Sequence, residues 1–273
     1  MFFKIALPLV LATGIGGPFA MKHGMQVDGP CGGSAFKGHG LMVQKLGITD
    51  VQKTSFKQAV DRHKPALAAK AQLFFDARSA LLDAGLDPAN TTDSLLPLQQ
   101  RTAEMGFELA KEVRSIYLEL LPHLTESQKA KAKMGFEMIR SKMGQGLGEE
   151  QGHRHGMMMH LMGARLDLSD AQKQAVESIH VAHKPAIEAK KEAFHGLIMT
   201  AVDAGLDPNT TEDALRQNQQ KVAEAAFALA TEVRGAYLES LPVLSEAQRV
   251  KGREFLSQLR THKEGLRKVM LGL

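Results

Sequence analysis

The sequence contains a single cysteine, Cys31, no tryptophan and only two tyrosines among its 273 residues. One cysteine excludes an intrachain disulfide framework and any zinc site built from several cysteines of one chain. Aromatic residues make up only 5%, which argues against an all-β fold, because strands favour β-branched and aromatic side chains. The 44% of hydrophobic residues come mainly from Ala, Leu, Val and Met, and this composition predicts an all-α fold.

The sequence also lacks a long run of basic charge. Its 34 basic and 30 acidic residues are interspersed and give a net charge of +4, so we expect no nucleic-acid partner. Motifs for a phosphate-binding loop, a nucleophile elbow, a zinc protease or a dinucleotide site are absent. We therefore expect a protein that is not an enzyme and requires no cofactor.

The N-terminus predicts export. Lys4 precedes an uncharged, largely apolar run over residues 5–17, and small residues follow up to Ala20. This run of about 13 residues is shorter than the roughly 20 that a membrane-spanning helix needs, so we interpret residues 1–20 as a signal peptide. An uncleaved anchor is the alternative. The prediction is a periplasmic protein without stable membrane insertion.

An internal repeat organises the rest of the chain. Residues 46–140 align with residues 166–260 at a spacing of 120, and about 40 of these 95 positions are identical without a gap. The alignment predicts two copies of one helical module, and it divides the chain into five parts: the signal peptide 1–20, a Gly/His/Met-containing segment 21–44, a first module 45–145, a Gly/His/Met-rich linker 146–164 and a second module 165–267.

Each module contains two helix-capping motifs, in which a Thr or Ser is followed three residues later by Gln. The hydroxyl accepts a hydrogen bond from the backbone of the third helical residue, and the Gln side chain accepts one from the backbone of the cap. These motifs predict four helix starts, at Thr49 with Gln52, Thr125 with Gln128, Ser169 with Gln172, and Ser245 with Gln248.

Prolines predict the interruptions of these helices. Pro65 and Pro185 fall within the first helix of each module and should kink or split it. Pro97 has no counterpart in the second module, so the second helix of the first module is expected to begin later. His63 and His183 precede the two shared prolines, and we expect each to bond a carbonyl that its proline leaves free.

The paired motifs resemble those of the Spy/CpxP family of periplasmic proteins, in which a Leu-Thr-x-x-Gln motif occurs twice. Leu124-Thr-Glu-Ser-Gln128 and the Leu-Ser-x-x-Gln motif ending at Gln172 carry the resemblance, which covers most of residues 45–265. The resemblance implies an elongated, curved helical cradle and an ATP-independent chaperone of the envelope stress response that binds unfolded or misfolded periplasmic proteins.

Two modules in one chain imply a pseudo-dimer within the chain, and a homo-oligomer is the alternative. Other members of the family modulate an envelope stress sensor kinase, which is a further partner that the resemblance implies. Aromatic residues that recur on the second helix of each module are candidates for binding clients on the cradle, although their spacing also fits an ordinary helical core; they are Phe107, Tyr117, Phe227 and Tyr237.

The linker predicts metal binding as an alternative function. Imidazole and thioether groups together favour Cu or Zn, and they are concentrated at His153, His155, Met157, Met158, Met159, His160 and Met162. His23 would be the third residue after cleavage at Ala20, a position that favours Cu(II). The chain would then resemble the ZraP and CnrX-like metal-binding relatives. A solvated linker whose methionines pack against the next helix is the simpler interpretation.

Overall fold

The computed structural model describes residues 46–145 and 165–255. All regular elements in these two ranges are helices, and neither range contains a strand, which confirms the all-α prediction. The elements are α3 (Asp50–Leu86), α4 (Thr92–Leu120), η2 (Leu121–His123), α5 (Glu126–Gln145), α7 (Asp170–Leu206), α8 (Glu212–Ser240), η3 (Leu241–Val243) and a last helix over 246–255.

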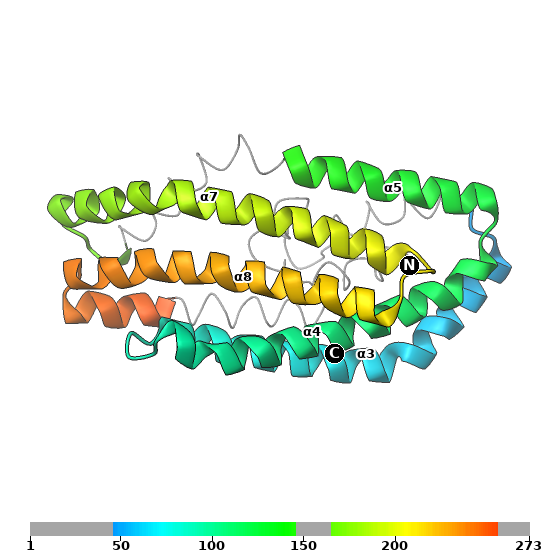
Figure 1. The fold of residues 1–273 in the computed structure, drawn as a ribbon, viewed down its shortest axis with the longest axis horizontal. Coiled ribbons are helices and arrows are strands. Elements are labelled where there is room, and N and C mark those ends of the chain that lie inside the picture. The colour runs from blue at the N-terminus through cyan, green and yellow to red at the C-terminus, as the bar shows by residue number, and fades with distance from the viewer. Residues whose placement is uncertain (1–45, 146–164, 256–273) are drawn as a thin grey trace, which may run out of the picture.

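The long helices form two antiparallel pairs. α3 packs against α4 as the first pair, and α7 packs against α8 as the second pair. The two pairs meet along α4 and α8, which lie side by side and run in opposite directions along the length of the molecule (Figure 1). The predicted signal peptide 1–20, the segment 21–44 and the linker 146–164 lie outside the described residues.

Local sequence explains how each pair turns. Asp87 ends α3, and its carboxylate accepts a hydrogen bond from the backbone N–H of Ala89 at 2.9 Å, which forms a tight Asx turn. The hydroxyl of Thr91 then accepts from the backbone of Ser94 at 3.2 Å and caps α4. At the other end α4 passes into the short helix η2, which contains Pro122.

The prolines interrupt these helices less than their positions predict. α3 continues through Pro65, and α7 continues through Pro185, so of the two expected outcomes the split is wrong and the kink stays a prediction. One proline removes one backbone hydrogen bond, and buried residues on both sides of Pro65 hold α3 against α4. The expected late start of α4 is also wrong, because α4 begins at Thr92 with Pro97 inside it.

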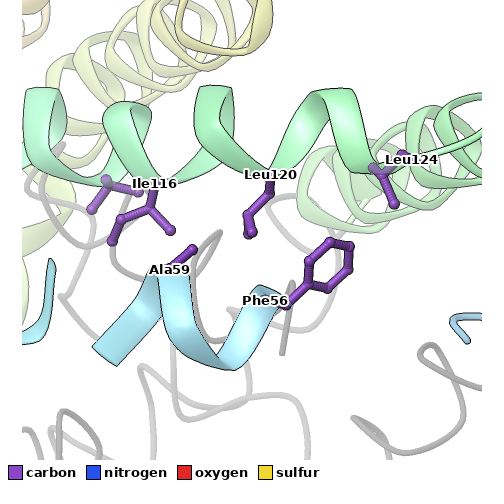
Figure 2. Packing of buried hydrophobic residues seen from close by; sticks show 6 residues of the cluster. Phe56, Ala59, Ile116, Leu120 and Leu124 are labelled. Carbon is purple, nitrogen blue, oxygen red and sulfur yellow. The ribbon is translucent and has the colours of Figure 1, made fainter. Parts of the chain in front are cut away.

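The main hydrophobic core lies in the first pair. Phe56 and Ala59 of α3 pack against buried residues of α4 (Figure 2), and the cluster consists of Phe56, Ala59, Val113, Ile116, Leu120 and Leu124. Val202 of α7 also packs against this cluster. Burial of such side chains is the dominant favourable contribution to folding.

The second pair has a smaller core. Its buried cluster consists of Ile198, Met199 and Val222. At the equivalent of Ile116 the second copy has Ala236, and at the equivalent of Leu120 it has Ser240. The second pair therefore buries less apolar volume near η3 than the first pair buries near η2. None of the described helices combines the length and the apolar character that crossing a bilayer requires.

Candidate functional site

Both capping motifs of the first pair form, and they contact each other. The hydroxyl of Thr49 accepts from the backbone of Gln52 at 3.2 Å, and the Gln52 side chain accepts from the backbone of Thr49 at 3.0 Å. Thr125 and Gln128 make the same two bonds at the start of α5. The two glutamine side chains then donate to each other, at 2.9 and 3.0 Å. Two helix starts that are far apart in sequence are thus joined.

The second pair repeats this arrangement. Ser169 and Gln172 form a complete capping box at the start of α7, and Ser245 and Gln248 form one at the start of the last helix. Gln172 and Gln248 exchange side-chain hydrogen bonds at 2.9 and 3.1 Å. The capping residues therefore have a structural role at the ends of the molecule, where they fix the angle between helices.

A polar cluster links the two helices of each pair near the shared prolines. In the first pair His63 contacts Glu112 at 2.6 Å through Nδ1 and Glu119 at 3.0 Å through Nε2. In the second pair His183 contacts Glu232 at 2.8 Å and Glu239 at 3.1 Å. The expectation that these histidines bond a carbonyl near proline is wrong, because the facing helix offers carboxylates that compete better for an imidazole.

These contacts determine the charge of the histidines. An ionised carboxylate only accepts, so contacts of both ring nitrogens with carboxylates favour the imidazolium form of His63. Burial opposes this charge, but the hydrogen bonds to Glu112 and Glu119 outweigh it and raise the pKa of His63. In the second pair the hydrogen bonds to Glu232 and then Glu239 raise the pKa of His183. The two clusters are charged links between helices.

Reciprocal arginines join the two pairs. Arg114 of α4 donates to the carbonyls of Asp207 and Thr210, each at 3.0 Å. Its equivalent, Arg234 of α8, donates to the carbonyls of Gly85 at 2.7 Å and Asp87 at 3.1 Å. Each arginine thus satisfies carbonyls in the last turn of a helix of the other pair or just beyond it, where the helix dipole also favours a positive charge.

One of the two junctions is filled by side chains. We call it the closed junction, and it consists of α4 residues from Glu104 onward with the end of α7 and the start of α8. Lys111 pairs with Glu212 at 2.7 Å, and Arg216 pairs with Glu104 at 3.0 Å. The guanidinium of Arg216 also lies 4.3 Å above the ring of Phe107.

The other junction is not filled. We call it the open junction, and it consists of α8 residues from Glu224 onward with the end of α3 and the start of α4. On the helices that form it, the side chain of Leu82 is 43% exposed, that of Leu96 40% and that of Val233 49%. Val113, the equivalent of Val233 in the first copy, is only 2% exposed. A hollow of about 340 Å³ lies here between α4 and α8, and Lys190 of α7 also lines it.

The four candidate aromatics occupy different environments. Phe107 is 3% exposed within the closed junction, where Arg216 covers its ring, and its role in client binding stays a prediction. Tyr117 and Tyr237 are half-buried, and the hydroxyl of Tyr237 donates to the carbonyl of Leu86 at 3.3 Å. Phe227 is half-buried and lines the hollow of the open junction.

The predicted metal-binding residues lie outside the described residues. This applies to His23 and to the linker residues His153, His155, Met157, Met158, Met159, His160 and Met162. Among the residues that the structure describes, no group of three or more His, Cys, Asp or Glu side chains is arranged to hold a metal ion.

Sequence reasoning missed the open junction. Its signal is present in the alignment of the two copies, where Leu96 stands at the position of Arg216 and Thr231 at that of Lys111. These differences become informative only once α4 is known to pack against α8. Comparison of the chain with protein families, curated proteins and solved structures found no significant match.

Proposed function

We propose that this protein is an ATP-independent chaperone that binds unfolded polypeptides in the periplasm. The observation that carries the proposal is the open junction, where Leu96 and Phe227 line a hollow. The apolar side chains of Leu82, Leu96 and Val233 are exposed on the three helices that form this junction. Large apolar side chains that stay exposed beside a hollow favour an interaction with a partner. The paired motifs that resemble those of the Spy/CpxP family support the same function.

The surroundings of this patch suit weak and adaptable binding. Lys190 lines the hollow beside Phe227, so charged and apolar groups lie together. Charged groups accelerate encounter with a partner, and a shallow apolar surface accepts many sequences. An unfolded chain exposes the apolar side chains that such a surface binds.

Suppression of aggregation tests the proposal. The purified protein, without ATP, is mixed with reduced α-lactalbumin as a model client, and light scattering is followed. We expect suppression by the wild-type protein and a loss of at least about threefold in potency for Leu82→Ser with Val233→Ser, because these side chains are already exposed and their loss leaves the fold intact. Absence of suppression by the wild type contradicts the proposal.

Val51→Ser is the matched control variant. Val51 is an exposed valine at the first turn of α3, at the opposite end of that helix from Leu82. We expect it to retain the potency of the wild type. An equal loss in this variant assigns the effect to general surface hydrophobicity and contradicts the role of the open junction.

Periplasmic location is part of the proposal and rests on the interpretation of residues 1–20 as a signal peptide. Cell fractionation with N-terminal sequencing of the mature chain tests it. Recovery in the periplasmic fraction with a new N-terminus near Met21 is the expected result. Recovery of an intact N-terminus in the membrane fraction supports the uncleaved anchor instead.

A second candidate function is binding of Cu or Zn by the linker. It is favoured by the seven His and Met residues between His153 and Met162. Replacement of residues 153–162 by a Gly/Ser linker is expected to weaken metal binding in a calorimetric titration. Unchanged affinity after this replacement rejects the linker as the site, and unchanged suppression of aggregation separates the two functions.

A further inference from the structure

The closed junction contains its own example of arginine recognition. The guanidinium of Arg216 stacks 4.3 Å above the ring of Phe107 and pairs with Glu104 at 3.0 Å. Guanidinium groups combine stacking on an aromatic ring with pairing to a carboxylate better than any other side chain. In this fold, an aromatic ring and a carboxylate three residues apart on one helix thus contact one guanidinium together.

The open junction keeps this ring and this carboxylate but lacks the arginine. Phe227 is the equivalent of Phe107, and Glu224 is the equivalent of Glu104. Leu96 stands where the closed junction has Arg216. Phe227, Glu224 and Leu96 all line the hollow of about 340 Å³.

Further differences between the two copies enlarge this space. Thr92 and Thr231 line the hollow, whereas their equivalents in the closed junction are Glu212 and Lys111, which form an ion pair across it. Ala228 also lines the hollow at the position of Glu108. The shorter side chains remove both the volume and the ionic contact that close the other junction.

Gln99 places an unsatisfied donor at the same hollow. Gln99 is 7% exposed, and its buried Nε2 atom has no hydrogen-bond partner. A buried donor without an acceptor is costly, so a ligand that brings an acceptor gains binding energy here. The acceptor that every polypeptide offers is its backbone carbonyl.

The charged groups around the hollow fit an incoming cation, because the hollow offers that cation a carboxylate. Lys190 also lines the hollow, but Glu232 pairs with its ammonium group. Glu224 is exposed and accepts one hydrogen bond from Gln220. An incoming guanidinium would meet the carboxylate of Glu224, while the charge of Lys190 is balanced by Glu232.

We propose that the open junction binds an arginine side chain of the bound polypeptide. Its guanidinium stacks on Phe227 and pairs with Glu224, as Arg216 does with Phe107 and Glu104. A backbone carbonyl of the same segment accepts the hydrogen bond of Gln99 Nε2. This inference rests on the proposed function, because it assigns a preferred residue to the polypeptides that the chaperone binds.

Short peptides test the inference directly. Ac-Gly-Ser-Arg-Ser-Gly-NH2 is titrated into the full chain, and binding is followed by calorimetry and by NMR shifts of the Phe227 ring. Peptides with citrulline or leucine in place of arginine are the comparison. Stacking and one ion pair predict a preference for arginine over citrulline of about fivefold to thirtyfold. Equal affinities for arginine and citrulline overturn the inference.

One variant removes the carboxylate of the site, and a second fills the site with an arginine of the chain itself. Glu224→Gln keeps the shape of an exposed side chain, and it is expected to remove the preference for arginine over citrulline. Leu96→Arg supplies an internal arginine and is expected to abolish peptide binding. Glu104→Gln is the control, because this equivalent carboxylate already pairs with Arg216, and it should leave peptide binding unchanged. If Leu96→Arg does not fold, Glu224→Gln alone decides, and a preference retained in that variant overturns the inference.

The aggregation assay separates this inference from the proposed function. A wild-type protein that suppresses aggregation but does not prefer the arginine peptide keeps the chaperone function and rejects the arginine site. A protein that prefers the arginine peptide but does not suppress aggregation keeps the site and rejects the chaperone function.

Discussion

The side-chain amides of Gln52 and Gln128 are hydrogen-bonded to each other in both directions, although 76 residues separate them. The side chain of each glutamine also accepts a hydrogen bond from the backbone N–H of the threonine that caps its own helix. The Gln128 side chain donates in addition to the carbonyl of Gly47 at 3.1 Å. One amide pair thus joins two helix starts and the turn before α3.

This arrangement predicts strong coupling between the two glutamines. Gln128→Ala should lower the free energy of unfolding by about 2 kcal/mol, because Gln128 is buried and its loss leaves buried partners without a bond. Gln52→Ala changes a less buried side chain and should lower it by about 1 kcal/mol through the loss of a cap and the shared bond. The double variant should lose less than the sum, by about 0.5–1.5 kcal/mol. Urea unfolding measures all three. Additive losses would show that the two caps act independently.

Gly47 and Gly196 are expected to respond in opposite directions to alanine. Gly47 has φ +64°, and an added methyl group meets no neighbour there, so Gly47→Ala should cost about 1 kcal/mol through backbone strain alone. Gly196 lies within α7, again with no neighbour within 4 Å, so Gly196→Ala should stabilise by roughly 0.5–1 kcal/mol. Thermal unfolding distinguishes the two, and a loss in both variants contradicts this assignment.

The histidine clusters predict that stability falls as the pH rises. The pKa of His63 is raised above its ordinary value of 6.5, so above that pH the folded chain holds a proton that the unfolded chain has lost. Its contribution is complete below pH 6.5 and disappears as the pH rises through the folded pKa. The pKa values of Glu112 and Glu119 are lowered from their ordinary 4.5. These carboxylates therefore stabilise the fold above that pH, and this contribution is lost as the pH falls through their folded pKa values.

Unfolding free energies measured across this range test the clusters. The variant His63→Gln with His183→Gln should lose most of the decline between neutral and alkaline pH, because glutamine has no proton to release. His123→Gln changes an exposed histidine outside the clusters and is the control. A decline of the same size in the double variant would assign the pH dependence to other groups.

The reciprocal arginines predict that removing either one loosens the turn of the opposite helix pair. Arg234→Leu removes the donors to the carbonyls of Gly85 and Asp87, so amide hydrogen exchange should accelerate around residues 85–90. Arg114→Leu should accelerate exchange around residues 205–210 instead. The fold of each pair is expected to persist, because α3 packs on α4 and α7 on α8 independently of these bonds. Equal changes at both turns in either variant contradict the reciprocal assignment.

Much of the fold was predictable because its signals are local. A hydroxyl and a glutamine three residues apart favour a helix start where they precede an apolar helical pattern, so Thr49 and Ser169 indicated the beginnings of α3 and α7. The all-α composition pointed the same way. The prediction of a split at Pro65 failed because residues on both sides of this proline pack against α4 and compensate for one missing hydrogen bond. The sequence does not reveal this packing.

The candidate site was less predictable because it depends on contacts between the two copies. The helical spacing of Phe107 and Phe227 made them look equivalent, yet Arg216 covers one ring while Leu96 stands at the matching position near the other. Only the packing of α4 against α8 gives the difference between Arg216 and Leu96 a meaning. The partners of His63 were missed for the same reason, because Glu112 and Glu119 are about 50 residues away in sequence.

The central claim is that the open junction holds unfolded polypeptides. It is tested most directly by light scattering of aggregating α-lactalbumin with the wild-type protein, the variant Leu82→Ser with Val233→Ser, and the control Val51→Ser. We predict suppression by the wild type and by the control, and a loss of at least about threefold in potency in the double variant. Equal suppression by all three proteins, or suppression by none, would contradict the claim.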